Sequence, residues 1–135
     1  MAHLPLETIA RNVICDVSAY DSCVIQTTRD WEKLLLEMFY PERISKIKEL
    51  DPNFRSTTLI GVYLGVSIPG SAIEITSVEY TKSRGLYIHV ERNIMEGSNN
   101  ILNTYSPYHL VRIPKRTGRY RFNYTDNPDL TMEEQ

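Results

Sequence analysis

Apolar and polar residues alternate along most of residues 57–124, and this pattern limits the possible folds more than any other feature of the chain. A period of two places successive side chains on opposite faces of a strand, so each alternating run predicts a β-strand. The runs are separated by turn sequences such as Pro69-Gly70 and Arg84-Gly85, which are typical of chain reversals between antiparallel strands. This half of the chain is therefore predicted to form antiparallel β-structure.

The run after residue 57 is the most regular of these strands. Its apolar side chains share one face, and Gly61 and Gly65 lie on the other face, where a neighbouring chain can approach closely. The run at 73–78 alternates less cleanly. About seven strands are predicted, at residues 13–17, 23–27, 57–66, 73–78, 86–90, 110–113 and 120–124, and the first two are expected to form a hairpin around the turn 18–22.

One segment has the period of a helix instead. Thr28 is a suitable N-cap, and Asp30 and Glu32 place negative charge in the first turn. Pro41 ends the segment, because the residue before a proline avoids the helical conformation, and a weaker helical stretch follows at 42–49. An amphipathic helix of about three turns is predicted, with its apolar face formed by Trp31, Leu34, Leu35, Met38 and Phe39.

Length and composition agree with a single domain over residues 1–135. The chain is 41% hydrophobic and 24% charged, which is ordinary for a folded domain of this size. The predicted class is mainly β (α+β), with antiparallel sheets and one helix that covers a sheet. Residues 126–135 are polar and are expected to fray.

The charge balance argues against partners that are recognised by charge alone. The formal net charge is -2, so the overall field does not attract nucleic acid or anionic lipid. No apolar run in the sequence reaches the roughly 20 residues of a membrane span, and the first residues lack a signal-peptide pattern. We expect a cytoplasmic protein if this is the full-length product, and an envelope or extracellular one if an export signal was removed.

Histidine and cysteine do not suggest a metal site. His3, His89 and His109 are scattered and lack the spacing of zinc ligands, so no metal or cofactor is expected. Cys15 and Cys23 lie eight residues apart around the predicted turn, a geometry that permits a disulfide. Two cysteines without an export signal are more typical of buried thiols, and we expect them to be reduced.

Common catalytic signatures are also absent. The sequence has no Gly-rich phosphate loop, no Gly-x-Ser-x-Gly elbow and no His-Glu-x-x-His motif. His109 is the best candidate for a general base, because it borders a long loop that also carries Tyr105 and Tyr108. A small hydrolase or transferase built on these residues is therefore an alternative to a binding domain. His89 is expected to face solvent from its strand.

Basic and aromatic residues are interleaved near the end of the chain, a combination that can bind single-stranded nucleic acid. Alternation nevertheless places the basic side chains of the last strand on one face and its aromatic rings on the other, which separates charge from stacking. We therefore expect the aromatic rings of this strand to face the core. The basic side chains are expected to face solvent or to bind an acidic protein partner, and no nucleic-acid partner is expected. The residues are Arg112, Lys115, Arg116, Arg119 and Arg121, with Tyr120, Phe122 and Tyr124.

The segment 93–107 is long, polar and rich in asparagine, with isolated apolar residues. Loops of this length are usually functional or disordered, and their apolar side chains can contact a partner. Together with the turn at 69–72, it is predicted to form a protein-binding surface. The predicted binding residues are Ser71, Ala72, Met95, Asn99, Asn100, Ile101, Tyr105, Tyr108 and His109.

Four segments in the later part of the chain carry a resemblance to a known family. They are residues 60–65 (IGVYLG), the turn 69–70 leading into 73–78, the strand 86–90 and, above all, residues 106–115 (SPYHLVRIPK). Together they resemble the C-terminal domain of the PrcB family, named for an accessory subunit of a bacterial surface protease complex. The resemblance covers about residues 23–124 and includes the Asp30-Trp31 pair at the start of the helix. It departs from the family after Gly70, where a Gly-Gly-Tyr-like segment is replaced by other residues.

The resemblance implies a small, mainly β, non-enzymatic domain that associates with a protein partner, in the founding case a subtilisin-like protease. Three hypotheses follow from the sequence as a whole. The favoured one is an accessory domain that binds a protein through its loops. The others are a small enzyme that uses His109 with a loop tyrosine, and a protease inhibitor that acts through an exposed loop.

Overall fold

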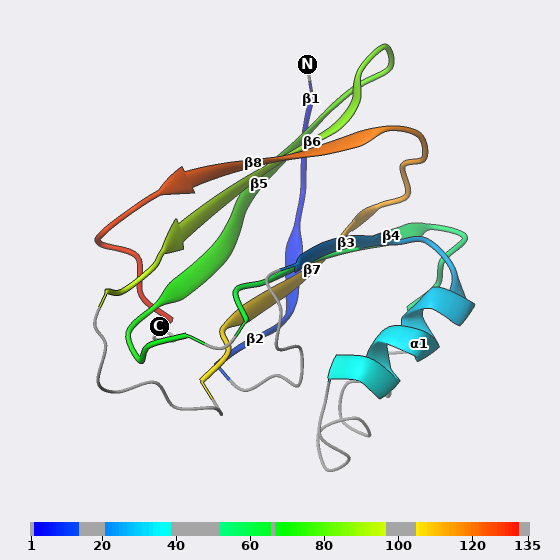
Figure 1. Cartoon of the computed structure of the whole chain (residues 1–135). Helices are drawn as coiled ribbons and strands as arrows, with labels where there is room; N and C mark the ends of the chain where they lie inside the picture. Colours follow the sequence, from blue (N-terminus) through cyan, green and yellow to red (C-terminus); the bar gives the residue numbers. More distant parts are fainter. Residues whose placement is uncertain (1, 14–20, 39–51, 66, 97–104, 133–135) are drawn as a thin grey trace.

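The computed structural model describes residues 2–13, 21–38, 52–65, 67–96 and 105–132. Within them, eight strands form two facing four-stranded sheets, and one helix lies outside the sheets (Figure 1). This confirms the predicted mainly β class, with eight strands where about seven were expected. The elements are β1 (Ala2–Leu4), β2 (Glu7–Asn12), β3 (Asp21–Ile25), α1 (Thr28–Met38), β4 (Thr57–Tyr63), β5 (Ala72–Thr81), β6 (Gly85–Asn93), β7 (Tyr108–Pro114) and β8 (Tyr120–Asp126).

The strands are divided between two sheets. Sheet A has the order β1-β5-β6-β8, and sheet B has the order β2-β7-β4-β3. Neighbouring strands are antiparallel except β6 and β8, which are parallel. The chain begins in sheet A and crosses to sheet B at Pro5-Leu6, between β1 and β2.

The first strands differ from the sequence prediction. Strands β1 and β2 were not expected, because β1 is only three residues long and the edge strand β2 is mostly exposed or half-buried and shows little alternation. The expected hairpin partner at 13–17 lies almost entirely outside the described residues. The strand predicted at 23–27 is found at Asp21–Ile25, where it pairs with β4.

The hydrophobic core fills the space between the two sheets. Strand β4 contributes Ile60, Val62 and, just after its end, Leu64, as the alternation predicted. Gly61 lies on the opposite face under the side chain of Tyr63, so the predicted close approach is also found. The buried core residues are Leu4, Ile60, Val62, Leu64, Ile73, Ile75, Val78, Leu86, Ile88, Val90, Val111 and Ile113.

A β-bulge explains why the alternation in β5 is irregular. The register between β5 and β6 shifts between Ile75 and Ser77, and Thr76 has no partner in β6. A bulge adds one residue to a strand and so changes which side chains face inward. Consequently Ile75 and Val78 both enter the core, although strict alternation would place them on opposite faces.

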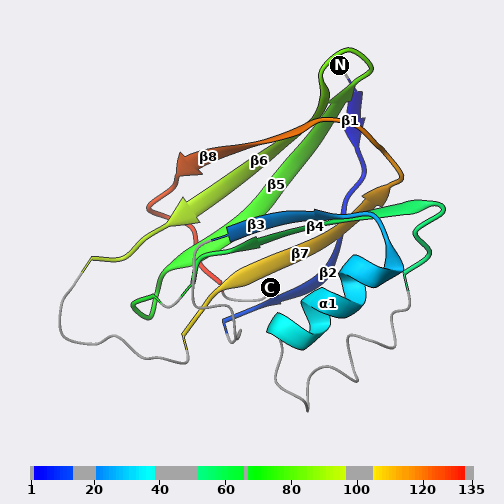
Figure 2. The same cartoon turned by 45° about the vertical axis from the view of Figure 1, so that its right-hand side comes forward.

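The helix covers the outer face of sheet B (Figure 2). The Oγ1 atom of Thr27 accepts a hydrogen bond from the Asp30 amide at 3.2 Å, so the N-cap is Thr27. The N-cap expected from the sequence was Thr28, so its position is corrected by one residue. Trp31 is 4% exposed and belongs to a second apolar cluster with Leu59 and Leu110 of sheet B. The predicted helix end at Pro41 and the weaker helix at 42–49 lie outside the described residues.

The residues after β8 form hydrogen bonds with the end of β6. Asp126 closes β8, and the Asn127 amide donates a hydrogen bond to the Arg92 carbonyl at 2.8 Å. The side-chain amide of Asn93 donates to the carbonyls of Pro128 and Leu130 at 3.1 and 3.2 Å. These hydrogen bonds place residues 127–130 beside the end of β6. The expected fraying of residues 126–135 stays a prediction, and residues 133–135 are not described.

Removal of the Trp31 ring is expected to weaken the fold strongly. Trp31→Ala should lower the free energy of unfolding by about 3 to 5 kcal/mol, the range for large aromatic truncations in a core. Lys33→Ala on the exposed side of the same helix is the control and should change it by less than about 0.5 kcal/mol. Urea unfolding of both variants measures the difference, and equal small losses would mean that the ring does not hold the helix on sheet B.

Two glycines with positive φ provide a second stability test. Gly85 has φ 81° and Gly118 has φ 105°, so alanine is strained at both positions, at a cost on the order of 1 kcal/mol. A Cβ at Gly85 would also collide with the backbone carbonyl of Arg119, whereas one at Gly118 meets nothing within 4 Å. Gly85→Ala should therefore cost about 1 to 3 kcal/mol more than Gly118→Ala in thermal or urea unfolding. Equal costs would contradict the close approach of β8 to the β5–β6 turn.

Candidate functional site

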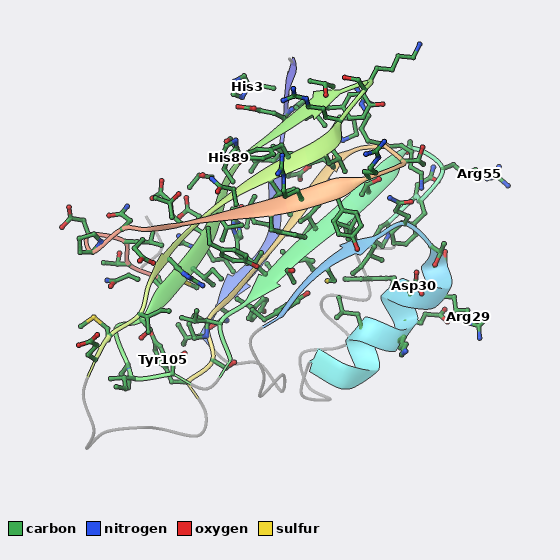
Figure 3. All side chains as sticks on the ribbon, turned by 45° about the horizontal axis from the view of Figure 1, so that its top comes forward. His3, Arg29, Asp30, Arg55, His89 and Tyr105 are labelled. Carbon is green, nitrogen blue, oxygen red and sulfur yellow. The ribbon has the colours of Figure 1, made fainter. Side chains whose placement is uncertain are left out.

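One end of the sandwich brings three of the predicted binding residues together. The Oγ atom of Ser71 accepts a hydrogen bond from the Met95 amide at 3.0 Å. The hydroxyl of Tyr105 donates to the Ser71 carbonyl at 2.8 Å. We call Gly70, Ser71, Ile94, Met95 and Tyr105 the Ser71 junction, and Figure 3 labels Tyr105 at this end of the molecule.

The surface of the Ser71 junction is apolar. Among the described residues, the exposed large hydrophobic side chains are Ile94 at 54%, Met95 at 43% and Tyr120 at 52%, and two of these three are adjacent in the junction. Met95 lies over Gly70, where an added Cβ would be 3.4 Å from the Met95 Cγ atom. The Ser67 amide donates a hydrogen bond to the Tyr105 carbonyl at 2.8 Å, which holds the backbone of Tyr105 in the junction.

Several predicted binding residues, including Ser71 of the junction, are not on the surface. Ser71 and Ala72 are 0% exposed, Tyr108 is 2% exposed and His109 is 3% exposed. Tyr108 and His109 belong to β7, in the middle of sheet B, and not to a loop. These four side chains are packed inside the domain and do not offer contacts to a partner in this structure. Asn99, Asn100 and Ile101 lie outside the described residues.

His109 connects the two sheets. Its Nδ1 atom accepts a hydrogen bond from the Ile75 amide of sheet A at 2.9 Å, next to the bulge. This assigns the proton to Nε2, which donates to Thr8 Oγ1 in β2 at 2.8 Å. Burial, and secondarily the positive charge of Arg11, lower the pKa of His109 to about 4, so the ring is neutral at neutral pH.

This geometry counts against the proposed His109 general base. Both ring nitrogens of His109 already have partners inside the domain, and the Tyr105 hydroxyl is used by the Ser71 carbonyl. A general base must reach a substrate proton directly or through one water molecule. In the part of the chain that the structure describes, no group of three or more His, Cys, Asp or Glu side chains is arranged to hold a metal ion.

The outer face of sheet A carries polar residues that sequence reasoning did not connect. His3, Glu79, Tyr87 and Arg121 lie in one row across its four strands, as the strand registers show. The Oε1 atom of Glu79 is 3.6 Å from His3 Nε2 and 3.5 Å from His89 Nε2. Figure 3 shows His3 and His89 in the same region. The sequence placed His89 on an outer face but did not reveal that β8 pairs in parallel with β6.

The basic segment does not form one continuous patch. The guanidinium of Arg116 lies over the Tyr80 ring at 5.2 Å, and Arg112 pairs with Glu7 at 2.5 Å. Lys115 donates to the Gln26 carbonyl at 3.2 Å. Of the aromatic residues, Phe122 and Tyr124 pack against the core, whereas Tyr120 is exposed. The absence of a nucleic-acid partner stays a prediction.

The cysteine prediction is also untested. The Sγ atom of Cys23 lies 3.3 Å from the hydroxyl of Tyr63, inside sheet B. Cys15 is outside the described residues, so the reduced state of the pair stays a prediction.

Comparison with known proteins identifies no relative: no family model matches the chain, and neither a curated protein nor a solved structure is significantly similar to it. None of the described helices has the length and apolar character needed to cross a membrane. Strand β4 pairs with β7, and the Leu64 amide donates to the Pro107 carbonyl at 2.9 Å, so residues 60–65 and 107–114 lie side by side in sheet B. The resemblance to the PrcB family stays a prediction.

The buried neutral His109 predicts a pH-dependent stability. The unfolded chain takes up a proton near pH 6.5, whereas the folded one does so only near pH 4. Below pH 6.5 the unfolded state therefore binds more protons, so the free energy of unfolding falls as the pH is lowered to about 4, by up to about 3 kcal/mol.

Urea unfolding at several pH values between about 7.5 and 4 tests this expectation. His109→Asn keeps an acceptor near the Nδ1 position but cannot titrate, so it should remove most of the loss between pH 6.5 and 4. Lys33→Ala, which removes an exposed side chain and keeps every histidine, is the control and should leave the slope unchanged. An equal pH slope in wild type and His109→Asn would show that another group is responsible.

Proposed function

We propose that this domain is a non-enzymatic protein-interaction module that binds a protein partner through the Ser71 junction. The observation that carries the proposal is the exposure of two adjacent large apolar side chains, Ile94 and Met95, on a backbone held from both sides. Exposed apolar patches commonly mark interaction sites, and methionine is enriched at protein interfaces.

The local backbone supports this role. Strand β6 ends at Asn93, whose side chain is bound to the carbonyls of Pro128 and Leu130. The next anchored position is Met95, whose amide is bound to Ser71. Ile94 lies between these two anchors, so its side chain is presented from a backbone that is already ordered. Preorganisation of this kind lowers the entropy lost on binding.

The class of partner comes from the sequence resemblance. Similarity to the PrcB family favours a protease complex, in which the domain would act as an accessory subunit. A protease inhibitor that uses the same junction is a variant of this proposal, since it requires the same contact. The two roles differ in the activity of the bound protease, which an accessory subunit preserves and an inhibitor abolishes.

Charged substitutions in the junction test the proposal. The double variant with Ile94→Asp and Met95→Asp should bind its partner at least about tenfold more weakly, since a central apolar contact contributes about 2 kcal/mol or more. Tyr120→Asp is the matched control, because Tyr120 has a similar exposure but lies on β8. Both variants should retain the wild-type melting temperature within a few degrees, since only exposed side chains change.

The partner is first identified by cross-linking and mass spectrometry. Its affinity for the purified wild type, the double variant and Tyr120→Asp is then measured by calorimetry. Selective loss of binding in the double variant supports the junction. Equal affinity of a well-folded double variant and the wild type would contradict it. Activity of a captured protease, measured with and without the domain, distinguishes an accessory subunit from an inhibitor.

A further inference from the structure

The outer face of sheet A contains a hollow at one end of the β5–β6 hairpin. The helix α1 lies on the other sheet, and none of the described elements covers this face (Figures 1 and 2). The hollow has a volume of about 220 Å³ and is lined in part by Glu79, Arg84, Leu86, Tyr87 and Arg121. It shares no residue with the Ser71 junction.

Backbone geometry creates the hollow. Gly85 has a positive φ of 81°, which turns the chain between β5 and β6. The Arg119 carbonyl accepts a hydrogen bond from the Leu86 amide at 2.9 Å, which brings the start of β8 beside this turn. The Arg84 amide is bound to Thr81 Oγ1 at 3.1 Å, which fixes the backbone from which the Arg84 side chain extends. Side chains from three strands and one turn therefore surround one space.

The charges around the hollow favour a singly charged anion. Two guanidinium groups, Arg84 and Arg121, and one carboxylate, Glu79, line it. Among the described residues, neither arginine has a carboxylate partner, whereas Glu79 lies next to His3 and His89. The lining therefore has one positive charge in excess. This balance suits a monoanion and is less favourable for a dianion such as phosphate, which Glu79 repels.

The two sides of the hollow are suited to different parts of a ligand. The guanidinium of Arg121 lies 5.1 Å from the centre of the Tyr87 ring, so its planar donor group is held by the aromatic face. A planar fork of N–H donors matches the two oxygens of a carboxylate better than a point charge does. Tyr87 supplies apolar surface beside it.

We propose that this hollow binds a ligand that presents one carboxylate group next to a short apolar body. Arg121 and Arg84 bind the carboxylate, and the apolar part lies against Tyr87. Glu79 limits the ligand to a single negative charge. This chemistry occurs both in small free acids and at the C-terminus of a peptide, and the experiment below separates the two sources.

Titration of the ¹⁵N-labelled domain followed by NMR tests the proposal. Butyrate is the probe, and neutral butyramide, which has the same shape, is its control. Butyrate should shift the amide signals of Gly85, Tyr87 and Arg121 in a saturable manner, and butyramide should not. Arg121→Gln should weaken binding by about tenfold or more, whereas Lys82→Gln, on the same hairpin but outside the lining, should leave it unchanged.

Two further arms examine the source and the charge limit. An acetylated dipeptide with a free C-terminus is compared with its amidated form and with butyrate. If the hollow prefers the free acid to the amide and binds it at least as tightly as butyrate, the site is assigned to the end of a polypeptide. If butyrate binds more tightly than the dipeptide, the site is assigned to a small acid. Glu79→Gln should enable the hollow to bind inorganic phosphate, which the wild type should not bind. Absence of saturable shifts with both butyrate and the free peptide, or an unchanged affinity in Arg121→Gln, would overturn the proposal.

Discussion

The buried His109 of sheet B joins the two sheets across the core through its hydrogen bond with Ile75 of sheet A, and the packing of β5 on β7 depends on this contact. A buried imidazole is costly unless both nitrogens have partners, and here Ile75 of sheet A and Thr8 of sheet B supply them. The Ile75 amide adjoins the β-bulge in β5, where the register with β6 shifts. The bulge therefore has two effects: it turns Val78 into the core, and it adjoins the site where the inter-sheet hydrogen bond forms.

Local patterns in the sequence predicted much of the fold. Period-two alternation located β4, β6, β7 and β8, and helical spacing located α1. Features that depend on distant pairing were not predictable: the bulge at Thr76 disrupts the pattern of β5, and the edge strand β2 has little alternation because it is only partly covered. The N-cap was placed one residue too late because Thr27 and Thr28 are both suitable caps and only the hydrogen bond distinguishes them.

The candidate site was predictable only in part. Ser71, Met95 and Tyr105 meet because loops at one end of a sandwich lie close together, and the turn 69–72 and the segment 93–107 had been assigned to one surface from the sequence. His109 was misplaced in a loop, although it has the same parity as the core residues Val111 and Ile113, and that alternation indicates a buried position. The row of polar residues on sheet A could not be found from the sequence, because it requires the parallel pairing of β6 with β8.

That parallel pairing has a consequence for how the domain folds. Parallel neighbours cannot be joined by a tight turn, and between β6 and β8 the chain passes through β7 in the centre of sheet B. Sheet A therefore gains its last strand only after the chain has visited the other sheet, and sheet B receives β2 from a chain that starts in sheet A. Because each sheet contains strands that are far apart in the sequence, its stabilising contacts form late in folding. We therefore expect slow, all-or-none folding, in which neither sheet folds independently.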